Sequence, residues 1–137
     1  MTRKTFLSYI IIVLFLVSFV SISSAEDQNI NWEHLNKSLI EKMATDDFES
    51  QQSAMQDIIR FGYLSDNKLD IDETTFDLIN IYDTNLDPKV RQLAVVTLHS
   101  IKNKWAMKYL SENLRYEKDE NLKRFIAYCL YDYHKKS

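Results

Sequence analysis

The chain of 137 residues contains one glycine and one proline, whereas ordinary usage would supply roughly nine and seven. This shortage excludes glycine-rich phosphate-binding loops, and it disfavours small β-sandwiches and barrels, which need frequent Gly or Pro turns. Apolar residues make up 45% of the chain and charged residues 27%, with a net charge of −3, so neither a disordered chain nor the basic stripe of a nucleic-acid binder is indicated. We expect an all-α protein with no nucleic-acid partner.

The N-terminal segment has the three-part pattern of a secretory signal peptide. Two cations at positions 3 and 4 precede the almost wholly apolar residues 6–20, and small residues at 23–25 resemble those before a cleavage site. We expect a signal at 1–25, a short linker at 26–30, and export to the periplasm or the medium. The alternative is a retained membrane anchor, because the 17 residues 6–22 reach the lower edge of a bilayer span.

Apolar residues recur at helical spacing from residue 31 onward and predict about six helices. The first two are expected near 31–44 and 47–61. Gly62 directly follows the second, and we expect it to end that helix in left-handed backbone. The residues after it, 63–68, then form the longest loop of the chain.

The third helix is expected over 73–82. Asp70 can cap it, and Glu73, three residues later, would complete a capping box. Its apolar positions are Phe76, Leu78, Ile79 and Tyr82.

The fourth helix is expected from Pro88 to about residue 102. Asp87 is typical of an N-cap, and a proline at the first helical position loses no hydrogen bond. Asn103 is expected to take the left-handed capping role that glycine usually takes. A fifth helix over 104–115 carries the apolar residues Trp105, Ala106, Leu110 and Leu114.

Asp119 is expected to cap the last helix, which extends to about residue 133 before a basic tail at 134–137. The chain's single cysteine, Cys129, lies in an apolar run of this helix. We expect a buried core thiol there. The alternative is a disulfide to another chain.

Two segments of the chain repeat each other. Asp87–Leu98 and Asp119–Leu130 share an Asp, an aliphatic residue three later, a cation next, and a Leu eleven after the Asp, at an offset of 32 residues. A weaker copy begins at Asp47, at an offset of 40 residues from Asp87. Two-helix repeats of such periods are typical of helical arrays.

This pattern resembles the HEAT repeat, in particular the short bacterial HEAT-like form that also occurs in phycobilisome lyases. The segment from Asp87 through Val90, Arg91 and Ala94 fits that motif closely, and the segment from Asp119 fits it with Lys123 in place of the arginine. The resemblance covers nearly all of 31–133. It implies a short α-α superhelix, a HEAT-like solenoid, in which a structural ladder between repeats is formed by Asp87, Arg91, Asp119 and Lys123.

No constellation of catalytic or metal-ligating residues is visible in the sequence. His34, His99 and His134 lack a second ligand at metal-binding spacing, so we expect each to be on the surface or satisfied by hydrogen bonds. The acidic group Asp70, Asp72 and Glu73 lacks the central glycine of a calcium loop. We therefore expect no catalytic residues, no metal and no cofactor.

By the same resemblance, the second helix of each pair lines the concave face, where such proteins bind their partners. These helices are expected at 73–82 and 104–115, and Ile81 and Tyr109 are their exposed apolar residues. The candidate binding residues are Asp77, Asn80, Ile81, Lys108, Tyr109 and Glu112. Four tyrosines near the C-terminus, at 116, 128, 131 and 133, are expected in core and end-cap packing, or alternatively in a binding surface.

The sequence thus predicts an exported small HEAT-like repeat protein that binds another protein or a peptide, as an adaptor or scaffold without catalysis. One alternative is an accessory to, or a member of, a lyase-like enzyme system. Another is an inhibitor or structural protein of the cell envelope. Membrane contact is expected only if the signal is retained as an anchor.

Overall fold

The computed structural model describes residues 30–64 and 68–137. These residues form α-helices and two 3-10 turns, with no strand among them, which confirms the all-α prediction. The predicted signal at 1–25 lies outside the described residues and stays a prediction. Within the described ranges no helix is long and apolar enough to cross a membrane. The elements are α2 (Trp32–Met43), α3 (Phe48–Leu64), η1 (Asp72–Thr74), α4 (Thr75–Thr84), α5 (Pro88–Ile101), α6 (Lys104–Asn113), η2 (Leu114–Tyr116) and α7 (Glu120–Lys136).

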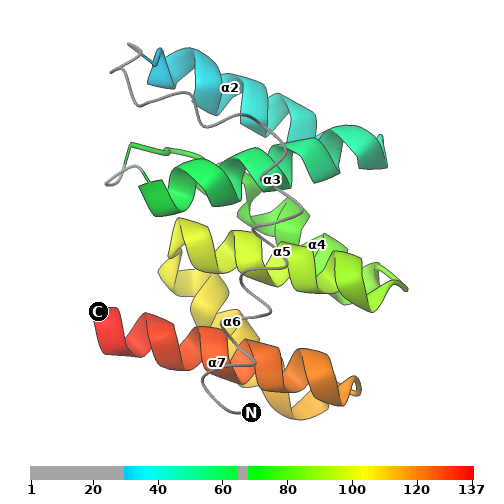
Figure 1. Cartoon of the computed structure of the whole chain (residues 1–137). Coiled ribbons are helices and arrows are strands. Elements are labelled where there is room, and N and C mark those ends of the chain that lie inside the picture. The colour runs from blue at the N-terminus through cyan, green and yellow to red at the C-terminus, as the bar shows by residue number, and fades with distance from the viewer. Residues whose placement is uncertain (1–29, 65–67) are drawn as a thin grey trace. The chain divides into compact units, whose positions relative to one another are not determined.

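Helix α5 is the centre of the packing. It contacts α3, α4 and α7 most extensively and α6 more lightly. In Figure 1, α3, α5 and α7 lie one below another in similar directions, with α4 and α6 behind them. Helix α2 packs on α3 and touches η1, so it forms one end of the helical array.

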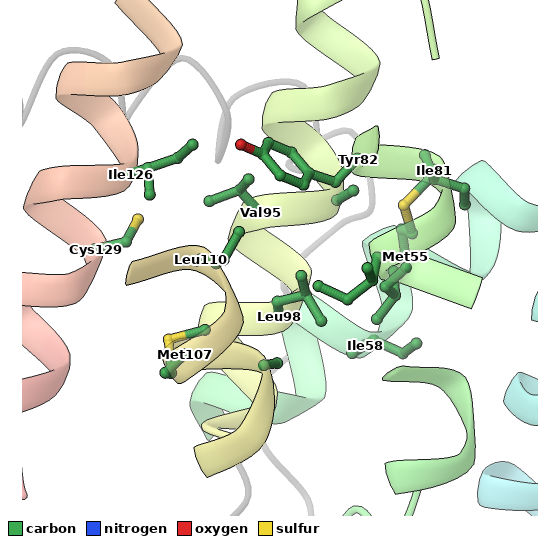
Figure 2. Packing of buried hydrophobic residues seen from close by; sticks show 14 of the residues in the cluster. Met55, Ile58, Ile81, Tyr82, Val95, Leu98, Met107, Leu110, Ile126 and Cys129 are labelled. Carbon is green, nitrogen blue, oxygen red and sulfur yellow. The ribbon is translucent and has the colours of Figure 1, made fainter. Parts of the chain in front are cut away.

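One apolar cluster runs through all six of these helices, and Figure 2 shows part of it. Leu98 of α5 is fully buried, as are Met55 of α3 and Leu110 of α6. Ala54 and Ala94, both inaccessible to solvent, let neighbouring helices approach closely. Cys129 lies in this cluster as a free buried thiol, and burial raises its pKa to about 12.

The predicted beginnings of α5 and α7 are confirmed. Asp87 accepts a hydrogen bond from the Lys89 N–H at 2.9 Å, and Pro88 occupies the first turn. Asp119 accepts one from the Leu122 N–H at 2.8 Å. Both aspartates thus satisfy N–H groups that have no partner within the helix.

The prediction for Asn103 is wrong. Lys102 takes the left-handed conformation, with φ of 58°, and its N–H donates to the carbonyl groups of Leu98 and His99. Asn103 instead caps α6, because its side chain accepts a hydrogen bond from the Ala106 N–H at 3.0 Å. Only two residues connect the helices, so Lys102 ends α5 and Asn103 is left to begin α6.

The capping box predicted for the third helix is also wrong. The chain enters α4 through η1, whose first flanking residue is the buried Ile71, and neither element has a side-chain cap. The Thr74 hydroxyl donates to the Ile71 carbonyl oxygen at 2.8 Å. Because Ile71 is buried in the core, the chain turns tightly through η1 at this point. This turn takes the place of the capping box that was predicted at Asp70.

The prediction that Gly62 ends its helix in left-handed backbone is wrong. Gly62 lies inside α3 and has a negative φ. A Cβ atom at this position would lie 3.0 Å from the Ser100 Cβ, from its Oγ and from its carbonyl oxygen. The missing side chain therefore allows α3 to approach α5 closely.

Gly62→Ala is expected to lower the free energy of unfolding by about 1–3 kcal/mol, since the new methyl group must push α3 away from Ser100. Alanine's better helix propensity, about 1 kcal/mol, works in the opposite direction. Urea unfolding measures the net effect. Ser53→Ala, at an exposed position of the same helix, is the matched control and should be nearly neutral. A Gly62→Ala protein as stable as that control would disprove the tight contact.

Candidate functional site

Three aromatic side chains on α4 and α6 form a continuous group, which we call the aromatic strip. Phe76 and Trp105 are exposed, whereas Tyr109, which was predicted to be exposed, is half-buried against the core. The ring of Phe76 lies 5.0 Å, between centroids, from the ring of Trp105, and Trp105 lies 5.7 Å from Tyr109 in a stacked arrangement. Phe76 is 69% exposed and Trp105 46% exposed. An exposed group of large aromatic rings is a typical mark of a protein-contact site.

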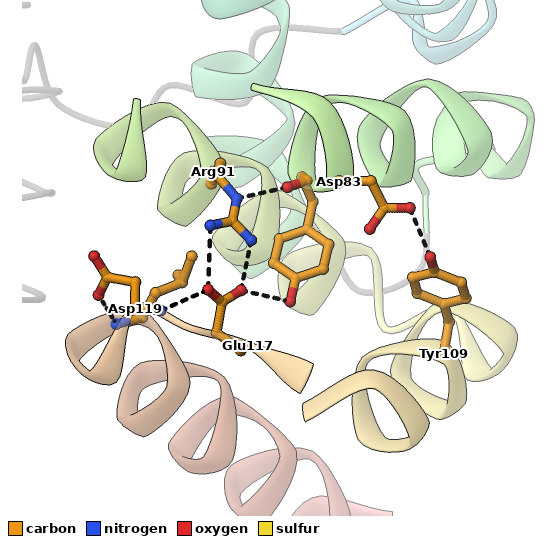
Figure 3. Close-up of polar contacts among 7 residues, drawn as sticks. Asp83, Arg91, Tyr109, Glu117 and Asp119 are labelled. Atoms are coloured by element: carbon orange, nitrogen blue, oxygen red, sulfur yellow. Dashed lines mark hydrogen bonds and ion pairs between the residues drawn. The ribbon is translucent and has the colours of Figure 1, made fainter. Parts of the chain in front are cut away.

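Two hydrogen bonds between side chains connect the two sides of the aromatic strip: one joins the N-cap of α6 to the η1 turn before α4, and the other joins α6 to α4. Asn103 donates from Nδ2 to Asp72 Oδ1 at 2.8 Å, and the Tyr109 hydroxyl donates to Asp83 Oδ2 at 2.6 Å (Figure 3). The bond to Asp83, together with partial burial, raises the pKa of Tyr109 to about 12. The strip is therefore fixed before any partner arrives, which reduces the entropy lost on binding.

The sequence prediction counted Phe76 and Trp105 only as apolar residues of their helices and did not identify either as exposed. Phe76 lies two residues before the buried Leu78, and positions two apart on a helix point in different directions. Likewise Trp105 directly precedes the buried Ala106. This offset from the apolar stripe could have identified Trp105 as exposed. Phe76 gave no such signal, because it also lies three residues before the buried Ile79, on the same side of α4.

The six candidate binding residues differ in their exposure and in their contacts. Tyr109 belongs to the aromatic strip, and Asn80 is exposed on α4. Lys108 and Glu112 form an exposed ion pair at 3.7 Å. Asp77 is half-buried, and this burial raises the pKa of its carboxyl group. The prediction that Ile81 is an exposed contact is wrong, because it is only 7% exposed in a helix that buries four of the five residues 78–82.

A cleft of about 470 Å³ lies between α2 and the residues that lead into α4, and we call it the acidic cleft. One ammonium group faces four carboxylates here, and Lys37 Nζ lies 4.0 Å from Glu41 Oε1. Asn36 also lines the cleft, and no donor from the described residues reaches its buried Oδ1 atom. The lining residues are Glu33, Asn36, Lys37, Ile40, Glu41, Asp70 and Glu73.

A chain of hydrogen bonds connects α3, α5 and α7. The Tyr63 hydroxyl lies 2.6 Å from His99 Nδ1, and His99 Nε2 lies 3.1 Å from Asp132 Oδ2. Lys136 contacts the same Asp132 oxygen at 2.9 Å. His99 is thus satisfied by hydrogen bonds, as predicted, although sequence reasoning identified neither of its partners.

Burial lowers the pKa of His99, although the neighbouring Asp132 acts in the opposite direction. With a neutral ring, Nδ1 accepts a hydrogen bond from the Tyr63 hydroxyl and the Nε2–H group donates one to Asp132. All three side chains then have hydrogen-bond partners. Burial also raises the pKa of Tyr63, which keeps its hydroxyl protonated. This arrangement is typical of a structural contact that holds helices together. A nucleophilic hydroxyl would need a lowered pKa, and that of Tyr63 is raised.

Acidification is expected to weaken the fold through His99. Because burial holds the pKa of His99 in the folded chain below the ordinary histidine value of 6.5, the unfolded chain binds the proton at a higher pH. The stabilising contribution is complete above pH 6.5 and is lost as the pH falls toward the lowered pKa. His99→Gln, uncharged at every pH, should flatten the stability profile between pH 5 and 7, roughly the range in which histidine titrates. His34→Gln, at an exposed position of α2, is the control and should leave the slope unchanged.

Arg91 forms a polar cluster with the chain before α7 (Figure 3). Its Nε donates to the Tyr82 carbonyl oxygen at 2.7 Å, and its Nη atoms bond both carboxylate oxygens of Glu117 at 3.1 and 2.5 Å. The Tyr82 hydroxyl and the Asp119 N–H donate to the same carboxylate at 2.9 and 3.0 Å. Of the other proposed ladder residues, Asp87 and Asp119 act as caps and Lys123 lies half-buried on α7.

The described residues contain no group of three or more His, Cys, Asp or Glu side chains placed to hold a metal ion. Compared with protein-family models, curated proteins and solved structures, the chain matches none. The geometry of its own residues is therefore the basis for any functional assignment.

Proposed function

We propose that this chain is an exported, short HEAT-like repeat protein that binds another protein or a peptide and carries out no catalysis itself. The observation that carries the proposal is the aromatic strip of Phe76, Trp105 and Tyr109. Two of its rings are largely open to solvent, and their helices are held together on both sides. Export is inferred from residues 1–25 by their sequence alone.

The repeat interpretation is supported by equivalent contacts in the second and third copies. Asp87 and Asp119, 32 residues apart, both cap long helices with their side chains. Each of these capped helices packs on the shorter helix that comes before it in the chain, α5 on α4 and α7 on α6. The connection from Arg91 to Glu117 ties α5 to the residues that lead into α7, which agrees with the structural role that the resemblance gives to this arginine.

The binding interpretation is supported by chemistry and position together. Aromatic rings bury a large area at a low entropy cost, so they commonly dominate the binding energy of an interface. The strip lies on α4 and α6, the two helices that the resemblance assigns to the partner-binding face. The aromatic pair on α7 is less well suited, because Tyr128 and Tyr131 lie on one helix, whereas the strip combines rings from two helices.

Site-specific photo-crosslinking tests this proposal. A photo-reactive phenylalanine derivative replaces Phe76 in the full chain, and in a matched protein it replaces Tyr131, which is 63% exposed on α7. We expect one partner to be crosslinked from position 76 and not from 131 in cells that produce the chain, and then to bind the purified protein. Equal capture from both positions, or capture from neither while the protein turns over a substrate, would overturn the proposal.

A further inference from the structure

We infer that the partner presents a cationic segment, with Lys or Arg side chains between apolar ones, and that this segment lies across the acidic cleft and the aromatic strip. This inference rests on the proposed function and names the chemistry of the ligand. The two parts of the surface adjoin at the start of α4. Glu73 lines the cleft, and Phe76 opens the strip three residues later, close to one helical turn.

The charge of the acidic cleft favours a cation. Glu33, Glu41, Asp70 and Glu73 face only Lys37, so the cleft has an excess of three negative charges. Ammonium and guanidinium groups supply several donors and no acceptor, which matches a surface of this kind.

The aromatic strip favours the same ligand. A cation is attracted to the face of a Trp or Phe ring, and Trp105 and Phe76 expose much of their surface. The chain forms such contacts within itself, since Lys68 Nζ lies 5.6 Å from the centroid of Trp32 and the Arg91 guanidinium lies 5.0 Å from that of Tyr82. An apolar side chain of the same segment would bury the remaining ring surface. An acidic segment would instead be repelled by the carboxylates of the cleft.

The test compares two dye-labelled synthetic peptides of equal length, one alternating Lys with Leu and one alternating Glu with Leu, by fluorescence anisotropy with the full chain. We expect the cationic peptide to bind roughly tenfold tighter or more, with an affinity that falls as salt is added. We also expect it to be crosslinked from position 76.

Two matched double variants locate the effect. Glu41→Gln with Glu73→Gln removes two charges from the acidic cleft, and Glu49→Gln with Glu120→Gln removes two exposed charges elsewhere. The first pair should weaken binding of the cationic peptide roughly fivefold, and the second should leave it nearly unchanged.

Three results would overturn the inference: equal affinity for both peptides, equal weakening by both double variants, or no crosslink to either peptide. The proposed function is decided separately, by the cellular partner captured from position 76. A captured partner that binds through a neutral or acidic segment would refute the cationic ligand and leave the binding function standing.

Discussion

Replacing Arg91 by Met should lower the free energy of unfolding by roughly 3 kcal/mol, because it leaves the Glu117 carboxylate buried without its cation. The Glu117 side chain is 1% exposed and that of Arg91 20%. The substitution also removes the donor to the Tyr82 carbonyl oxygen, which lies at a contact between α4 and α5. Urea denaturation measures the loss, and retained helical circular dichroism shows that the fold survives.

A double-mutant cycle separates the ion pair from packing. Glu117→Gln keeps the shape of the side chain but has one acceptor oxygen, so it can accept from either the Tyr82 hydroxyl or the Asp119 N–H, which bond different oxygens of Glu117. We expect the double variant, Arg91→Met with Glu117→Gln, to be less destabilised than the sum of the two single variants, since it buries no unpaired charge. Additive effects would show that the pair is not coupled.

The same pair predicts a dependence on pH. Burial opposes ionisation of Glu117, but hydrogen bonds from the Asp119 N–H, Arg91 and Tyr82 outweigh it and hold its pKa below the usual range. The stabilisation from this group is therefore present above the pKa of an unfolded glutamate, near 4.5, and is lost as the pH falls through the lowered value. In the Arg91→Met variant the pKa of this carboxyl group in the folded chain should rise toward or above that of an unfolded glutamate, so the loss of stability on acidification that comes from this group should shrink or reverse.

Sequence periodicity predicted the helices well because each one buries an apolar stripe. The helix that begins after Asp87 was predicted as 88–102 and observed as Pro88–Ile101, and the last one begins after the predicted cap at Asp119. Caps of this kind depend only on neighbouring residues, so a sequence contains all that they require. The boundaries that were missed depend on distant contacts. Gly62 lies inside its helix where α3 approaches Ser100 of α5, a contact between residues far apart in the chain that the sequence does not reveal.

The candidate site was harder to predict, because exposure depends on which neighbours cover a helix. Phe76 and Ile81 are both apolar residues of α4, yet the first faces solvent and the second joins the core. Periodicity within a single helix does not distinguish them when most of its circumference is apolar. Glu117 was missed for a similar reason, since it lies outside the repeated segments and meets Arg91 only through the fold.

Removing the aromatic strip should abolish most of the binding and leave the fold intact. Phe76→Ala combined with Trp105→Ala should weaken binding of the partner captured from position 76 by roughly 30-fold or more, the effect of losing at least one hot-spot aromatic residue. The cost in stability should be much smaller than that of a core truncation, since both rings are already largely hydrated.

Tyr131→Ala combined with Leu86→Ala is the matched control, because both side chains are large, apolar and strongly exposed outside the strip. This control should bind as tightly as the unmodified chain. Tyr109→Phe refines the experiment further. It keeps the ring and removes the hydroxyl that bonds Asp83, so a moderate loss of affinity would show that bracing of α6 against α4 contributes to recognition. Equal weakening by the strip and control variants would mean that general surface hydrophobicity, and not this braced aromatic group, holds the partner.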